Sequence, residues 1–132
     1  MREIKFRAWL KDKKEMVGIT TIDFKNGCVL IDKPYFPKIL EYYGTTLLFD
    51  QIELMQYTGL KDKNGVDIFE GDIVRIYLDD ENNKTEILIC IYNNKLTSFK
   101  FKDIDGGLWG VCDTCLEVIG NIYENKELLG EY

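Results

Sequence analysis

Apolar and polar side chains alternate with a period of two through most of this chain. Near the start, Ile4, Phe6 and Ala8 share one face of such a pattern. Alternation recurs in residues 73–78, with Val74, Ile76 and Leu78 inward, and residues 87–92 are apolar on both faces, as in a central strand. Successive side chains of a strand point to opposite faces, so the pattern predicts strands rather than helices. We therefore expect an all-β fold with little helix.

Asn26-Gly27 is the first clear hairpin signal. Both central positions of a type I′ turn need a positive φ, which Asn and Gly tolerate. A two-residue turn at this place sets Phe24 opposite Val29 and Ile22 opposite Ile31, so that apolar side chains share a face. We expect a hairpin with that register.

A second group of turn residues lies in the middle of the chain. Asn64-Gly65 repeats the hairpin signal, and Glu70-Gly71-Asp72 predicts a tight turn that leads directly into a strand. In that turn, the Asp72 carboxylate is expected to accept hydrogen bonds from backbone amides. All these residues are interpreted as structural.

Both prolines of the chain lie in residues 33–37, which are expected to form an extended connector, and 38–43 is a candidate helical turn. From the strand and turn pattern we expect a β-rich N-terminal part of hairpins, residues 1–53, followed by a small barrel in residues 54–132. The two parts could also form one integrated unit.

The formal net charge of −6 disfavours nucleic-acid binding, which depends largely on cations that neutralise phosphates. Residues 1–16 nevertheless carry an excess of basic side chains, Lys5 and Arg7 among them. No stretch resembles a signal peptide or approaches the length of a membrane span, so we expect a cytoplasmic protein. In that compartment the four cysteines are expected to be thiols.

Three segments carry a family resemblance. Residues 2–9 read Arg-Glu-Ile-Lys-Phe-Arg-Ala-Trp, residues 54–76 include Tyr-Thr-Gly-Leu-Lys-Asp-Lys-Asn-Gly and Ile-Phe-Glu-Gly-Asp, and residues 118–125 read Val-Ile-Gly-Asn-Ile-Tyr-Glu-Asn. Together they resemble the YopX family of phage and prophage proteins. The resemblance implies an all-β fold whose C-terminal part is similar to an SH3-type barrel. It implies no known activity.

Few residues suggest catalysis or metal binding. The chain has no histidine, which excludes His-dependent hydrolytic triads and removes the commonest metal ligand. Cys112 and Cys115 have the spacing of half a zinc site or of a redox pair, but no second such pair is present. Glu70 and Asp72 could act as paired carboxylates, although a turn explains both. We expect no enzyme activity, no cofactor and no metal.

Aromatic side chains are more numerous than alternating core positions require. Those outside a core are favoured at interfaces, and we name Arg7, Trp9, Tyr35 and Tyr77 as candidate contact residues. The leading hypothesis is a noncatalytic module that binds another protein or forms a homo-oligomer. One alternative is a small-barrel protein that binds nucleic acid, and another is a thiol or metal protein that uses residues 112–115.

Overall fold

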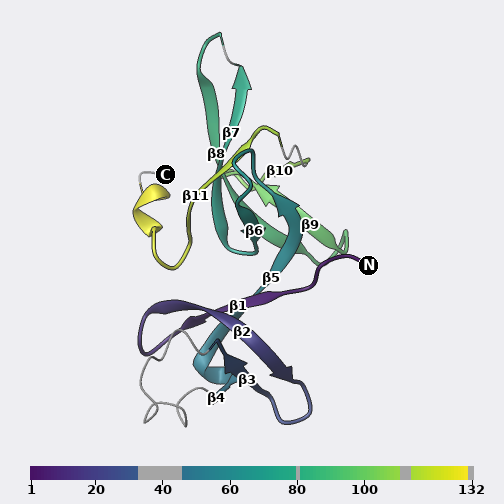
Figure 1. The fold of residues 1–132 in the computed structure, drawn as a ribbon. Coiled ribbons are helices and arrows are strands. Elements are labelled where there is room, and N and C mark those ends of the chain that lie inside the picture. The colour runs from purple at the N-terminus through teal and green to yellow at the C-terminus, as the bar shows by residue number, and fades with distance from the viewer. Residues whose placement is uncertain (33–45, 80, 111–113, 131–132) are drawn as a thin grey trace. The chain divides into compact units, whose positions relative to one another are not determined.

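The computed structural model describes residues 1–32, 46–79, 81–110 and 114–130, and the chain divides into two compact units (Figure 1). The N-terminal unit is Ile4–Gln56, and the C-terminal unit joins Met1–Glu3 to Tyr57–Tyr132. All pairings among the described strands are antiparallel. The all-β prediction is therefore confirmed. No helix in the described part of the chain has the length and apolar character needed to cross a membrane.

The N-terminal unit contains a sheet in which the hydrogen-bonded order is β4-β3-β2-β1-β5. Its strands are β1 (Phe6–Leu10), β2 (Glu15–Asp23), β3 (Cys28–Ile31), β4 (Thr46–Leu48) and the first part of β5 (Ile52–Lys61), and the short 3-10 helix η3 (Phe49–Gln51) precedes β5. Alternate side chains form the core, including Ala8, Leu10, Val17, Val29 and Ile31.

The C-terminal unit contains a second sheet, in the order β10-β9-β8-β7-β11. Its strands are β7 (Asp72–Asp79), β8 (Lys84–Asn93), β9 (Ser98–Lys102), β10 (Leu108–Trp109) and β11 (Leu116–Asn121). Strand β6 (Asp67–Phe69) pairs with β5, and the 3-10 helix η4 (Lys126–Leu128) follows β11. No strand pairing between described residues closes this sheet, so the SH3-like barrel stays a prediction.

One face of the second sheet supplies the core of the C-terminal unit. Val74, Leu88 and Phe101 are fully buried there, together with Ile68 from β6 and Leu116 from β11. This burial is the main favourable term, since each large aliphatic side chain removed from water contributes about 1.5–3 kcal/mol.

The register predicted at Asn26-Gly27 is wrong. Strand β2 pairs with β3 through Asp23↔Cys28 and Ile22↔Val29. The Asp23 carboxylate accepts hydrogen bonds from the backbone N–H and the side-chain amide of Asn26, and only Gly27, at φ 67°, has a positive φ in this loop. A four-residue loop replaces the two-residue turn, and Phe24 leaves the strand.

Asn64-Gly65 also lies in a longer loop than a two-residue turn. Asp62 Oδ1 accepts the N–H groups of Asn64 and Val66 at 2.8 and 2.9 Å, and only Gly65 has a positive φ there. The loop between β9 and β10 repeats this geometry. Asp103 Oδ1 accepts the N–H groups two and four residues on, and Gly106 has φ 88°. The sequence pattern Asp-x-x-Gly-x thus forms the same capped loop twice.

The hairpin of β7 and β8 extends beyond its neighbours in the sheet (Figure 1). Strand β11 pairs with β7 only up to Ile76, and β9 pairs with β8 only from Ile89 onward. Leu78 was expected to point inward, but it is 39% exposed, and no third strand among the described residues pairs with the end of the hairpin.

Candidate interaction surfaces

The structure places three of the four candidate contact residues, and they do not form one cluster. Arg7 and Trp9 are half-buried and lie on the same face of β1, opposite buried Ala8 and Leu10. Tyr77 is on β7 of the C-terminal unit. Tyr35 lies outside the described residues, as does the helical turn expected at 38–43.

Tyr77 belongs to a polar cluster with Glu117 and Lys63. Its hydroxyl donates to Glu117 Oε2 at 2.8 Å, and the Lys63 ammonium lies 3.8 Å from the centre of its ring and 3.5 Å from Glu117 Oε2. The hydrogen bond from Tyr77 lowers the pKa of Glu117, and Lys63 lowers it further. The hydroxyl and the ring face of Tyr77 are therefore both already in contact with other residues of the chain.

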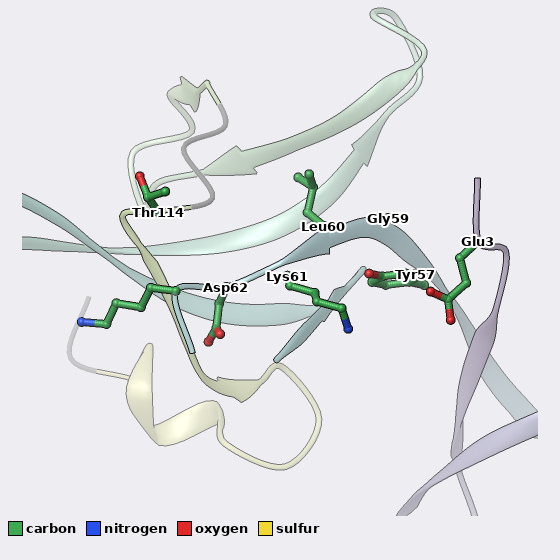
Figure 2. Close-up of a pocket in the computed structure, with 8 residues that line it drawn as sticks. Glu3, Tyr57, Gly59, Leu60, Lys61, Asp62 and Thr114 are labelled. Atoms are coloured by element: carbon green, nitrogen blue, oxygen red, sulfur yellow. The ribbon is translucent and has the colours of Figure 1, made fainter. Parts of the chain in front are cut away.

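A shallow pocket of about 480 Å³ follows the end of β5 (Figure 2). Glu3, Tyr57, Lys61 and Asp62 are among its lining residues. Figure 2 shows Tyr57, Lys61 and Asp62 spread along β5 and the loop that follows, whereas Glu3 comes from the N-terminal segment. The Lys61 ammonium is 2.6 Å from Asp67 Oδ1, and burial raises the pKa of Tyr57, with Asp67 adding to the effect.

Asp62, the buried carboxylate of this pocket, stabilises the fold. Besides the two loop amides, its Oδ2 accepts the N–H of Val118 in β11 at 2.9 Å, a bond across 56 residues of sequence. Burial alone would raise the pKa of Asp62, but the three backbone donors outweigh it and hold the pKa below its ordinary value. The carboxylate is consequently ionised, and both of its oxygens accept backbone hydrogen bonds.

Glu70, Gly71 and Asp72 form the tight turn between β6 and β7. The buried Asp72 accepts the N–H of Phe69 at 2.8 Å, and Gly71 has φ 84°. The Gly71 N–H donates to the Cys90 carbonyl, and its carbonyl accepts the N–H of Ile122. The Gly71 contacts hold the turn against β8 and the segment after β11, whereas Asp72 accepts a backbone amide, as expected of it.

The cysteines differ in state. Cys28 and Cys90 are free, and Cys90 belongs to the core. Cys115 is disulfide-bonded, so the expectation of a free thiol is wrong for this residue. Cys112 lies outside the described residues. Across the described ranges, no group of three Cys, Asp or Glu side chains is arranged to hold a metal ion.

An exposed apolar patch that the sequence did not predict lies on the N-terminal unit. It consists of Phe24, Leu48 and Phe49, which are 76%, 52% and 38% exposed. The two rings make an edge-to-face contact with centroids 6.4 Å apart, and the Phe49 N–H donates to the Gly27 carbonyl. The predictive signal was Asp23, three residues before Asn26, which favours a capped loop over a two-residue turn.

A second exposed apolar group lies at the end of the β8–β9 hairpin. Tyr92 and Phe99 pair across the strands with ring centroids 5.3 Å apart, and Tyr92 is 43% exposed. Leu96, in the loop, is 53% exposed. Each unit thus presents large apolar side chains at a hairpin end.

These features define a small all-β protein whose loop carboxylates cap backbone amides and whose apolar surface gathers at hairpin ends. The chain belongs to the YopX family, because the family model described as YopX protein matches residues 5–130. Among solved structures, the crystal structure of protein EF1440 from Enterococcus faecalis is similar, with 30% identity and a TM-score of 0.65, covering 98% of this chain and 99% of that one. A search of curated proteins found no significant match.

Proposed function

We propose that this protein is a noncatalytic interaction module that binds another protein or a second copy of itself. The observation that carries the proposal is the apolar patch of Phe24, Leu48 and Phe49 on the N-terminal unit. Large exposed aromatic and aliphatic side chains that lie together are typical of protein contact surfaces. Phe24 and Phe49 contact each other, yet Phe24 stays 76% exposed, and contact with a partner would bury this surface.

Strand β4 adds a second reason. Of the described strands, only β3 pairs with β4, and Leu48 belongs both to β4 and to the apolar patch. A strand edge can accept an extended segment of a partner through backbone hydrogen bonds. The Leu48 N–H already donates to Gln51 Oε1 at 2.8 Å, so a partner strand would displace this side chain. A partner strand added to β4 would bring its side chains directly beside Phe49 and Phe24.

We further infer the setting in which this module works. The YopX family resemblance supports an accessory role in a phage or prophage, in the cytoplasm of its host. An SH3-like arrangement of the C-terminal unit is supported by the consecutive pairing of β7, β8, β9 and β10 and by the return of β11 to β7.

Native mass spectrometry of the tagged protein, purified from cells that carry its natural partners, tests the proposal. We expect a stoichiometric protein complex for the wild type and its loss in Phe24→Ser. Ile104→Ser is the matched control, because Ile104 is 51% exposed on the C-terminal unit. A complex that survives Phe24→Ser and Leu48→Ser unchanged would contradict the role of this patch.

A further inference from the structure

The outer face of the C-terminal sheet combines isoleucines with basic side chains. Residues directly opposite in antiparallel strands point to the same face. The pairs Arg75↔Ile87, Ile89↔Lys102 and Ile91↔Lys100 therefore lie on one face, opposite the buried pairs of the core. Ile73, which pairs with Ile89, is on the same face and fully buried, so the chain itself covers the face at that position. We call this surface the basic face. Its three isoleucines in β8 are half-buried.

Cations predominate on the basic face although the chain as a whole is acidic. Among the described residues, its charged side chains are Lys63, Arg75, Lys100, Lys102 and Glu117, four cations against one carboxylate, whereas the formal charge of the chain is −6. Glu117 is engaged by Lys63 and Tyr77. Lys100 and Lys102 form no ion pair with any residue that the structure describes. The face therefore suits an acidic partner with some apolar surface.

The end of the β7–β8 hairpin has the complementary chemistry. Residues 79–86 contain four acidic side chains and a single lysine. Among the described side chains there, Glu81 and Glu86 are exposed, and Leu78 beside them is 39% exposed. This hairpin end extends beyond the pairing of β11 with β7 and of β9 with β8 (Figure 1).

We propose that the acidic end of the β7–β8 hairpin of one copy docks on the basic face of a second copy. The inference rests on the interaction function proposed above and assigns a partner, a second copy, to a surface other than the apolar patch. Glu81 and Glu86 would approach Lys100 and Lys102, and Leu78 would cover the isoleucines. The hairpin end continues the same strands that form the basic face, so it cannot fold back onto its own face.

A reciprocal dimer follows from the geometry. When one hairpin docks on the second copy, a two-fold axis allows the hairpin of that copy to dock in return, which doubles the contact and closes the assembly. Because the attraction is between exposed charges, the dimer should weaken as salt is added.

Sedimentation velocity over a range of protein concentrations, at low and high ionic strength, tests this dimer. We expect the wild type to dimerise at low salt, and Lys100→Glu with Lys102→Glu to raise the dimer dissociation constant at least about tenfold. Glu81→Lys with Glu86→Lys should have the same effect. All four changes in one chain should restore the dimer. Lys14→Glu with Lys25→Glu, two exposed lysines of the N-terminal unit, is the control of equal charge change.

Three results would overturn the inference. They are a wild type that stays monomeric at low salt, a dimer that Lys100→Glu with Lys102→Glu leaves intact, and failure of the fourfold variant to associate. Single-stranded DNA should not bind; salt-sensitive binding of it to the wild type that is lost in the lysine variant would instead assign the basic face to phosphates. None of these results affects the Phe24→Ser test, so failure of the dimer and failure of the interaction function are distinguishable.

Discussion

Asp62→Ala should strongly destabilise the C-terminal unit. The wild-type carboxylate is 6% exposed and accepts three backbone N–H groups at 2.8–2.9 Å, from Asn64, Val66 and Val118. A buried donor left without an acceptor costs about 1–3 kcal/mol, and the two loop amides can partly recover water. The sum is a loss of about 3–5 kcal/mol, a large share of the stability of a small domain. Asp62→Asn keeps one acceptor and should lose about 1–3 kcal/mol.

Urea unfolding followed by tryptophan fluorescence measures this loss. In a Trp9→Phe background, Trp109 reports on the C-terminal unit, since it packs against that core. Asp103→Ala is the matched control, because Asp103 caps the same kind of loop and its third bond comes from the Trp109 side chain rather than from a distant strand. We expect a clearly smaller loss for this exposed loop, because water can satisfy its amides. Equal losses in the two variants would refute the weight given to Val118.

The same carboxylate predicts an acid-side dependence of stability. The pKa of Asp62 is lower in the folded protein, because its backbone donors favour the ionised form over the opposing effect of burial. Its stabilisation is therefore complete above the ordinary pKa of about 4 and is lost as the pH falls through the folded value. Asp62→Ala should show a shallower loss of stability than the wild type below about pH 4. A decline of unchanged steepness would contradict the role of this ionisation.

Two further substitutions test the turns around Gly71 and Gly120. A Cβ at Gly120 would lie 2.6 Å from Asn125 Cγ and 2.8 Å from Asn125 Cβ, so Gly120→Ala should cost about 1–3 kcal/mol in urea unfolding. Asn125→Gly in the same chain should relieve most of that clash, and no relief would disprove the contact. At Gly71, φ is 84°, so Gly71→Ala should cost about 1–2 kcal/mol and Gly71→Asn less; thermal melts that rank the two variants in the opposite order would refute a backbone cause.

Sequence patterns predicted the class of fold because they depend on local geometry. Alternation found the strands around Ala8 and Val74, which are buried as a period of two requires, and the apolar run 87–92 found β8, which lies inside its sheet. The turn residues Gly27 and Gly71 have positive φ, as such residues favour. The family could also be recognised from the sequence. Residues 54–76 and 118–125 include turns in which the side chains of Asp62, Asp72 and Asn121 accept backbone amides, and such turns accept few residue types.

The two-residue turns predicted at Asn26-Gly27 and Asn64-Gly65 were wrong because other local hydrogen bonds compete with such a turn. Asn-Gly satisfies a two-residue turn, but Asp23 and Asp62 capture the following amides and lengthen both loops. The longer loop places Phe24 outside strand β2, so its side chain is 76% exposed instead of facing Val29.

By itself the sequence determined that this chain is an all-β member of the YopX family, because strand alternation and turn chemistry are properties of neighbouring residues. Only the tertiary structure decided that Asp62 reaches Val118 and that Lys100 and Lys102 flank isoleucines on one face. It also decided that Leu78 and Phe24 are exposed. These outcomes depend on strand register and on which strands lie side by side, and both are set by the packing of residues far apart in the chain.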